Sequence, residues 1–233
     1  WNAGAIVNLM WHACPPTQGD VCNWDGGLLS SMSDDDWNDL ITDGGYLNGV
    51  WKSRMDDISQ YLQYLEDRGV EVLWRPLHEQ NQGAFWWGGR TGEDGTQRLF
   101  QLTHDYMTDD KGLSNLIWVW DVQDLGTSYG GYHPGEEYFD LMALDIYGDA
   151  YSNRAYYDEL LVQAGDRPVA IGECFDLPPE SALADQPLYT FFMNWAYGLE
   201  VDWDGNPTIS IDFIQQVYAN PRVLTLDEMP GWG

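Results

Sequence analysis

The sequence predicts an α/β fold in which helices cover a parallel β-sheet. Short apolar runs alternate along the chain with segments whose apolar residues recur at helical spacing, which is typical of parallel strands joined by helices. The run that begins at Val70 is apolar on both faces of a strand, and this indicates burial on both faces. Two such runs end in a carboxylate, at Glu79 and Glu173. Because the carboxyl ends of parallel strands carry the chemistry in barrels and open α/β sheets, both acids are candidate site residues.

The elements follow in a regular order. Six strands are expected, near residues 5–12, 70–77, 116–121, 139–147, 168–173 and 190–195. Four helices are expected, over residues 51–65, 96–111, 154–164 and 209–218. Gly69 is a natural residue to end the first helix, and Thr96 is suited to cap the second. Residues 13–50 predict a long loop over the active face with at most short helices, and residues 123–138 predict a second loop rich in Gly and Tyr.

The first acid follows a polar cluster and precedes an aromatic loop. Residues 74–79 read Trp-Arg-Pro-Leu-His-Glu, and Phe85 and Trp86 follow. Aromatic faces beside an acid suit the apolar faces of sugar rings. The structural alternative is that Arg75 and Glu79 form a buried ion pair and that the tryptophans belong to the core.

The second acid repeats this design. Residues 167–174 read Arg-Pro-Val-Ala-Ile-Gly-Glu-Cys, a short apolar run that ends in Glu173. Two carboxyl groups can together break a glycosidic bond, because one protonates the leaving group and the other stabilises the positive charge that develops on the sugar. The matched placement at two strand ends therefore favours a glycoside hydrolase.

Taken together, these motifs resemble glycoside hydrolase family 26, most known members of which are endo-β-1,4-mannanases. The matching segments span nearly the whole chain in order: residues 11–12, 74–79, 85–88, 115–120, 145–148, 171–173 and 192–195. The resemblance implies that Glu79 is the acid/base, that Glu173 is the nucleophile and that Tyr147 is a partner of the nucleophile. It also implies substrate contacts at the remaining motif positions, Trp11, His12, Arg75, His78, Phe85, Trp86 and Trp195.

The resemblance further implies a (β/α)8 TIM-type barrel. In the family the acid/base ends the fourth strand and the nucleophile the seventh, whereas here they end the second and fifth expected strands. The offset is the same for both acids, so the sequence predicts six of eight strands, with the first two βα units missing. Those units could be truncated, cleaved off, or supplied by a second chain or fragment.

One residue departs from the family pattern. Members commonly carry an aromatic residue immediately before the Phe-Trp-Trp-Gly run, and this chain has Ala84 there. The stacking platform on the leaving-group side is therefore in question, and with it the choice of mannan over another β-glycan.

The histidines divide into two pairs. His12 and His78 would be satisfied core histidines if they stood alone, and the resemblance favours a sugar-contacting role. In a regular strand His78 would point to the face opposite Glu79. His104 and His133 are expected on the surface.

The charge and the aromatic content limit the classes of partner that the protein is expected to bind. The chain has 38 acidic and 10 basic side chains, a formal net charge of -28, which would repel nucleic acid and anionic lipid and leave a neutral polysaccharide unaffected. The 13 tryptophans and 14 tyrosines exceed what the core needs, and stacking on sugars is a use for the surplus. The acidity also fits an adaptation to salt or acid, so residues 34–36, Asp-Asp-Asp, are assigned no function.

The sequence predicts no metal and no cofactor. Three cysteines are too few and too dispersed for a zinc site, no phosphate loop follows a strand, and residues 202–206 lack the EF-hand spacing. Cys14 and Cys22 either bridge a loop or remain free, and Cys174 is expected to be a packed thiol. No run approaches the length of a transmembrane helix, and no initiating Met or signal peptide is present, so a processed or partial chain of a secreted protein is expected.

The predicted function is thus a single catalytic domain over residues 1–233, a retaining endo-β-mannanase that cleaves internal β-1,4 bonds by double displacement. The carboxyl groups of Glu79 and Glu173 are expected about 5–5.5 Å apart. Two alternatives remain: a relative in the same family that acts on mixed-linked β-glucan or β-1,3-xylan, and a non-hydrolytic carbohydrate-binding protein.

Overall fold

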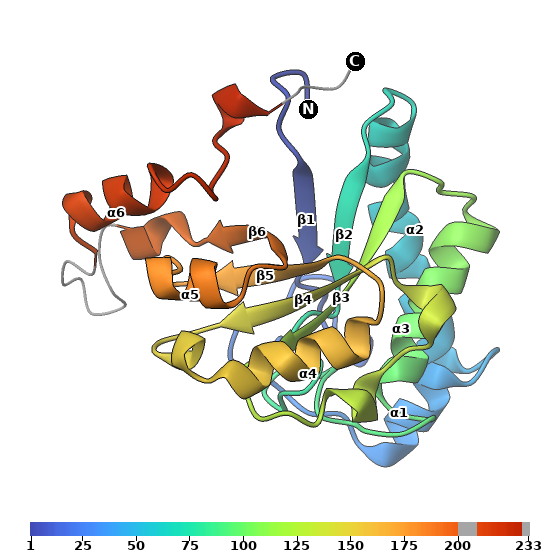
Figure 1. The fold of residues 1–233 in the computed structure, drawn as a ribbon. Coiled ribbons are helices and arrows are strands. Elements are labelled where there is room, and N and C mark those ends of the chain that lie inside the picture. The colour runs from blue at the N-terminus through green and yellow to red at the C-terminus, as the bar shows by residue number, and fades with distance from the viewer. Residues whose placement is uncertain (200–208, 230–233) are drawn as a thin grey trace. The chain divides into compact units, whose positions relative to one another are not determined.

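The structure, a computed structural model, describes residues 1–199 and 209–229 (Figure 1). The chain divides into two compact units. The N-terminal unit comprises residues 7–122 and 128–140, and the C-terminal unit comprises residues 1–6, 123–127 and those from 141 onward. The 202–206 segment, predicted not to bind a metal, lies outside the described residues. The expectation of a single domain stays a prediction.

Three parallel strands form the sheet of the N-terminal unit. They are β1 (Val7–Trp11), β2 (Val72–Pro76) and β3 (Leu116–Gln123), and β2 lies between the other two. All five residues of β2 are buried, as its apolar pattern on both faces predicts. This burial places the carboxyl end of β2, where the first acid follows, in the interior of the unit.

Three α-helices belong to this unit. The first, α1 (Asp34–Ile41), begins in the acidic run: Oγ of Ser33 accepts the Asp36 N–H at 3.1 Å. Carboxylates in a first turn stabilise a helix, so these aspartates have a structural use. The second, α2 (Tyr46–Glu66), contains the predicted 51–65 helix and ends before Gly69, whose φ of 66° lies in the left-handed region.

The third helix shows one wrong prediction. Thr96 does not cap α3 (Thr96–Asp105), because it is the first helical residue and Gly95 precedes it at the cap position. The Thr96 hydroxyl instead donates to the buried carbonyl of Trp87 at 2.7 Å, which ties the helix to the aromatic loop. The helix continues as a π-helical turn, η1 (Tyr106–Asp110), before Gly112, and the predicted 123–138 loop contains the 3-10 turns η2 (Tyr129–Tyr132) and η3 (Glu136–Tyr138).

The loop after β1 is closed by a disulfide between Cys14 and Cys22, with an S–S distance of 2.10 Å. The Arg54 guanidinium on α2 donates to the carbonyls of Cys14 and Gln18. The sequence left this disulfide open, and the structure contains it.

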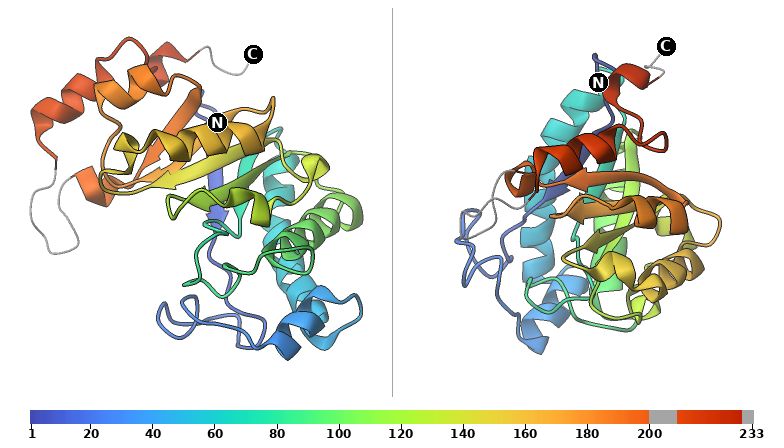
Figure 2. Two further views of the ribbon diagram at one scale, coloured as in Figure 1. Left: turned by 60° about the horizontal axis from the view of Figure 1, so that its bottom comes forward. Right: turned by 60° about the vertical axis from the view of Figure 1, so that its left-hand side comes forward.

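Three more parallel strands form the sheet of the C-terminal unit, β4 (Leu141–Ile146), β5 (Val169–Cys174) and β6 (Tyr189–Asn194), in that order. Helix α4 (Arg154–Ala164) has the predicted bounds and packs along β4 (Figure 2). The closing helix is α6 (Ile211–Tyr218), and α5 (Glu180–Asp185) was not predicted. The short turns are η4 (Ala150–Ser152), η5 (Ala196–Leu199) and η6 (Leu226–Glu228).

All six predicted strands are thus present within the described residues, each parallel to its neighbours within its unit. The expectation that His104 and His133 lie on the surface is wrong. Both are half-buried, and their rings lie 4.8 Å from that of Trp118 and 4.9 Å from that of Trp120. None of the helices in the described ranges combines the length and the apolar character needed to cross a membrane.

Candidate active site

Glu79 lies in an unusual turn at the end of β2. The strand ends at Pro76, and Leu77 and Glu79 have φ angles of 54° and 52°. Residues other than glycine rarely adopt this left-handed conformation, which costs roughly 1–3 kcal/mol where it persists. The prediction that His78 and Glu79 point to opposite faces assumed a regular strand through both residues. That assumption is wrong, because the strand ends before them.

Asp121, at the end of β3, holds the turn. Its Oδ1 accepts the backbone N–H of Glu79 at 2.7 Å, and its carbonyl accepts the N–H of Gln80 at 3.2 Å. Its Oδ2 pairs with Nη1 of Arg75 at 2.9 Å, and the side chains of Arg75 and Asp121 are 2% and 0% exposed. Arg75 is thus a buried cation whose ion pair with Asp121 steadies the backbone of the acid.

The Glu79 carboxylate receives a side-chain hydrogen bond from Gln82. Nε2 of Gln82 donates to Oε2 of Glu79 at 2.7 Å, and the Gln82 N–H donates to the Glu79 carbonyl at 3.1 Å, closing a tight turn. Glu79 is 7% exposed. Neither Gln82 nor Asp121 was found from the sequence, although Asp121 has the signal that found the two glutamates, a lone acid at the end of an apolar strand.

Aromatic rings surround His78 beside the acid. The His78 ring lies 4.8 Å from that of His12 and 4.9 Å from that of Phe85. Trp24, which was not predicted, lies 5.5 Å from His12 and is half exposed. Burial, with lesser contributions from Arg75 and His12, holds the pKa of His78 well below its usual range. His78 is therefore a neutral hydrogen-bonding group at neutral pH.

Trp11 and Trp86 pack against other tryptophans of the same unit. Trp11 stacks on Trp51 with 5.1 Å between ring centroids and, with His12, lines a small cavity of about 180 Å³. Trp86 is 1% exposed, and its indole N–H donates to the Ala13 carbonyl at 2.7 Å. Trp86 and Arg75 are therefore core residues of this unit.

Glu173 lies in the C-terminal unit, near the end of β5. Its Oε2 accepts two hydrogen bonds of 2.7 Å, one from the Tyr147 hydroxyl and one from the Trp195 indole N–H. The structure thus brings three predicted site residues together. Two donors on one carboxylate oxygen hold the group in one orientation, which is what a carboxylate nucleophile needs.

Backbone contacts hold these partners in place. Oδ2 of Asp124 accepts the N–H of Tyr147 at 2.8 Å, and the Asn194 amide donates to the Phe175 carbonyl at 2.7 Å. Asp124 and Asn194 were not predicted. Cys174 is fully buried, and burial raises the pKa of its thiol to about 11, so it is the packed thiol that the sequence predicts.

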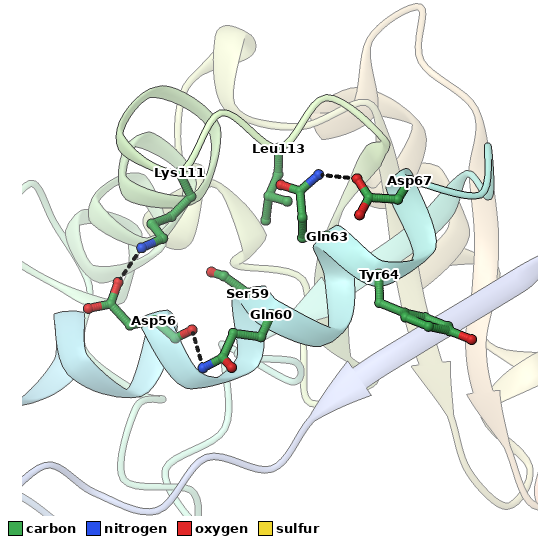
Figure 3. A pocket seen from close by; sticks show the side chains of 8 residues that line it. All are labelled: Asp56, Ser59, Gln60, Gln63, Tyr64, Asp67, Lys111 and Leu113. Atoms are coloured by element: carbon green, nitrogen blue, oxygen red, sulfur yellow. Dashed lines mark hydrogen bonds and ion pairs between the residues drawn. The ribbon is translucent and has the colours of Figure 1, made fainter.

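Two larger hollows are lined by other residues. One, of about 470 Å³ along α2 (Figure 3), has polar groups that bond one another, such as Gln63 to Asp67 and Lys111 to Asp56. The other, of about 490 Å³ in the C-terminal unit, contains Gly148 and Asp176, which follow Tyr147 and Glu173 in sequence. Among the described residues no group of three or more His, Cys, Asp or Glu side chains is arranged to hold a metal ion.

Comparison with known proteins identifies the family. Residues 1–228 match the family described as glycosyl hydrolase family 26. The chain belongs to this family. Membership confirms the resemblance drawn from the motifs.

Solved members of glycosyl hydrolase family 26 share the fold. The chain matches GH26A from Muricauda sp. MAR_2010_75 with a TM-score of 0.90 and 33% identity, over 97% of this chain and 74% of that one. It matches a β-mannanase from a symbiotic protist of the termite Reticulitermes speratus, solved with gluco-manno-oligosaccharide, with a TM-score of 0.82 and 31% identity, over 100% of this chain and 70% of that one. The predicted fold class, an α/β barrel type with six parallel strands present, is confirmed.

A curated relative carries an activity in its name. The chain is 30% identical to a mannan endo-1,4-beta-mannosidase of Thermothelomyces thermophilus over 98% of its own length and 47% of that protein. It covers 35% of a second relative that is also named as a mannan endo-1,4-beta-mannosidase. The chain therefore spans half or less of the length of these two relatives.

Proposed function

We propose that the protein is a retaining endo-β-1,4-mannanase in which Glu173 is the nucleophile and Glu79 is the acid/base. The observation that carries this proposal is the pair of 2.7 Å hydrogen bonds from Tyr147 and Trp195 to one oxygen of Glu173, which supports a carboxyl group held in one orientation. The mannanase names of its relatives supply the substrate class, neutral β-mannan.

The reaction proceeds in two displacements. In the first, Glu173 attacks the anomeric carbon, the glycosidic C–O bond breaks, and Glu79 gives its proton to the departing oxygen. In the second, Glu79 takes a proton from water, the water oxygen bonds to the anomeric carbon, and the ester bond to Glu173 breaks. Two inversions give net retention, and the second step returns the proton to Glu79.

The polar contacts around Glu79 fit a residue that changes protonation in each step. Asp121 holds its backbone and Gln82 holds its carboxyl group, while His12, His78 and Phe85 form an aromatic wall beside it. We also propose that the protein is secreted, an assignment that the Cys14–Cys22 disulfide supports because such bonds persist in oxidising surroundings.

Two variants separate the roles of the acids. Glu173→Ala should abolish turnover on every substrate. Glu79→Ala should cripple hydrolysis of mannan and spare the first step on an aryl β-mannoside whose leaving group needs no proton, so that the glycosyl-enzyme accumulates and azide speeds its breakdown. Glu71→Ala, an exposed glutamate in the same unit as Glu79, is the control and should hydrolyse mannan at the parent rate.

The outcomes distinguish the alternatives. Azide rescue of Glu173→Ala in place of Glu79→Ala would reverse the two assignments. Turnover of mixed-linked β-glucan or β-1,3-xylan in preference to mannan would keep the mechanism and replace the substrate. A chain that binds manno-oligosaccharides and hydrolyses no substrate on the panel would be a carbohydrate-binding protein.

A further inference from the structure

Gln82 is a polar side chain that contacts the Glu79 carboxyl group and has no part in the two displacements described above. It lies three residues after the acid, in the turn that leads into the aromatic loop, and it is 9% exposed. A buried carboxamide must place both a donor and an acceptor, so its contacts are informative.

Chemistry fixes the orientation of this carboxamide. The backbone N–H of Ala84 donates to Oε1 of Gln82 at 2.6 Å. A backbone N–H can only donate, so the atom that it meets must be the amide oxygen. The amide nitrogen is then the atom that faces Glu79, and it donates to Oε2 across 2.7 Å.

We propose that Gln82 is a positioning residue that orients the Glu79 carboxyl group and favours its ionised form, so that it sets the upper pH limit of the first catalytic step. The inference rests on the proposed role of Glu79 as the acid/base. A donor aimed at a carboxylate stabilises the ionised state, because a hydrogen bond to a charged oxygen is stronger than one to a neutral carboxyl group. Ala84 acts through Gln82, since its N–H keeps the carboxamide from turning over.

Other charged and titratable groups lie around Glu79 within its unit. Asp121 on β3 accepts its backbone N–H, Arg75 on β2 pairs with Asp121, and His78 and His12 lie in the aromatic wall. The substitution of Gln82 removes none of these groups, so a change at residue 82 isolates the carboxamide.

Gln82→Met keeps the length of the side chain and removes the donor. The alkaline limb of the pH profile of kcat/KM on mannan should move to higher pH by about one unit, since a hydrogen bond to a charged group is of that order. Gln82→Glu keeps an acceptor for the Ala84 N–H and adds a negative charge beside Glu79, so its limb should move further. Gln101→Met is the matched control, because the half-buried Gln101 also donates through Nε2, to the Pro134 carbonyl at 2.7 Å.

The test uses the whole chain. An alkaline limb and a Glu79 carboxyl titration that both stay in place in the two Gln82 variants, or a limb that moves as far in Gln101→Met, overturn the inference. If Gln82→Met does not fold by circular dichroism, Gln82→Glu decides, since it preserves the Ala84 contact. An NMR titration of the ¹³C-labelled Glu79 carboxyl, assigned with Glu79→Gln, needs no turnover. A carboxyl titration that moves while the activity profile does not would uphold the role of Gln82 and remove Glu79 from the role of acid.

Discussion

Oε2 of Glu173 accepts the hydroxyl hydrogen of Tyr147 across 2.7 Å, and the Tyr147 backbone is itself anchored by Asp124. Tyr147→Phe keeps the ring and removes this donor. We expect kcat/KM on mannan to fall roughly 10- to 100-fold, the range for losing one hydrogen bond to a charged group.

The control for this variant is Tyr157→Phe in the same unit. The Tyr157 hydroxyl is buried and accepts the Leu188 N–H at 2.9 Å, so this change also removes a bonded hydroxyl. An equal loss of kcat/KM in both variants would show that Tyr147 acts through stability alone.

The buried pair of Arg75 and Asp121 predicts a large effect on stability. Asp121→Ala should lower the free energy of unfolding by about 3–5 kcal/mol, because it leaves a buried cation without this partner and removes the acceptor for the Glu79 N–H. Asp34→Ala is the comparison: Asp34 pairs with Arg90 at the surface with 87% of its side chain exposed, and its loss should cost at most about 1 kcal/mol. Urea unfolding measures both, and similar losses would contradict the role given to the buried pair.

His78 predicts a pH dependence of stability. Its pKa in the folded chain lies well below the ordinary value near 6.5, because of burial first and then Arg75 and His12. The unfolded chain therefore takes up a proton that the folded chain does not, and stability falls as the pH drops below about 6.5. His78→Phe removes this contribution. The loss of unfolding free energy between pH 7 and 5 should shrink by at most about 2 kcal/mol, and an unchanged loss in urea unfolding at the two pH values would contradict the prediction.

The strands could be predicted because burial on both faces leaves a plain pattern. The runs that became β2 and β5 are mainly apolar and are buried throughout, and each is followed by or ends near one glutamate. The family motifs at residues 145–148 and 192–195 then identified Tyr147 and Trp195. The structure places both as donors to one oxygen of Glu173.

What could not be predicted depends on contacts between distant segments. The left-handed turn at Leu77 and Glu79 has no signal in residue type, because its cost is met by a carboxylate on another strand, Asp121. The hydroxyl of Thr96 was predicted to cap a helix, and it donates to the Trp87 carbonyl instead. In the sequence Gln82 looks like an ordinary loop residue, because its contact with Glu79 depends on the turn that brings the two side chains together.

The separation of the two acids is a prediction for a crystal structure with a mannobiose or longer ligand bound. The carboxyl groups of Glu79 and Glu173 should lie about 5–5.5 Å apart, which allows direct attack on the anomeric carbon. A separation beyond about 6.5 Å in a complete, ordered site would leave room for a water and would exclude the retaining mechanism.

Ala84 offers a gain of function. It is exposed, it lies next to Phe85, and family members commonly carry an aromatic residue at this position. Ala84→Trp should add a stacking surface on the leaving-group side and tighten binding by about 0.5–1.5 kcal/mol, roughly 2- to 10-fold, while the backbone N–H that orients Gln82 is retained. Ala84→Leu is the matched control, because it adds apolar volume without an aromatic plane. Calorimetric titration of short manno-oligosaccharides into the inactive Glu173→Ala background measures both changes, and equal affinities for the Trp and Leu variants would show that another ring already supplies the platform.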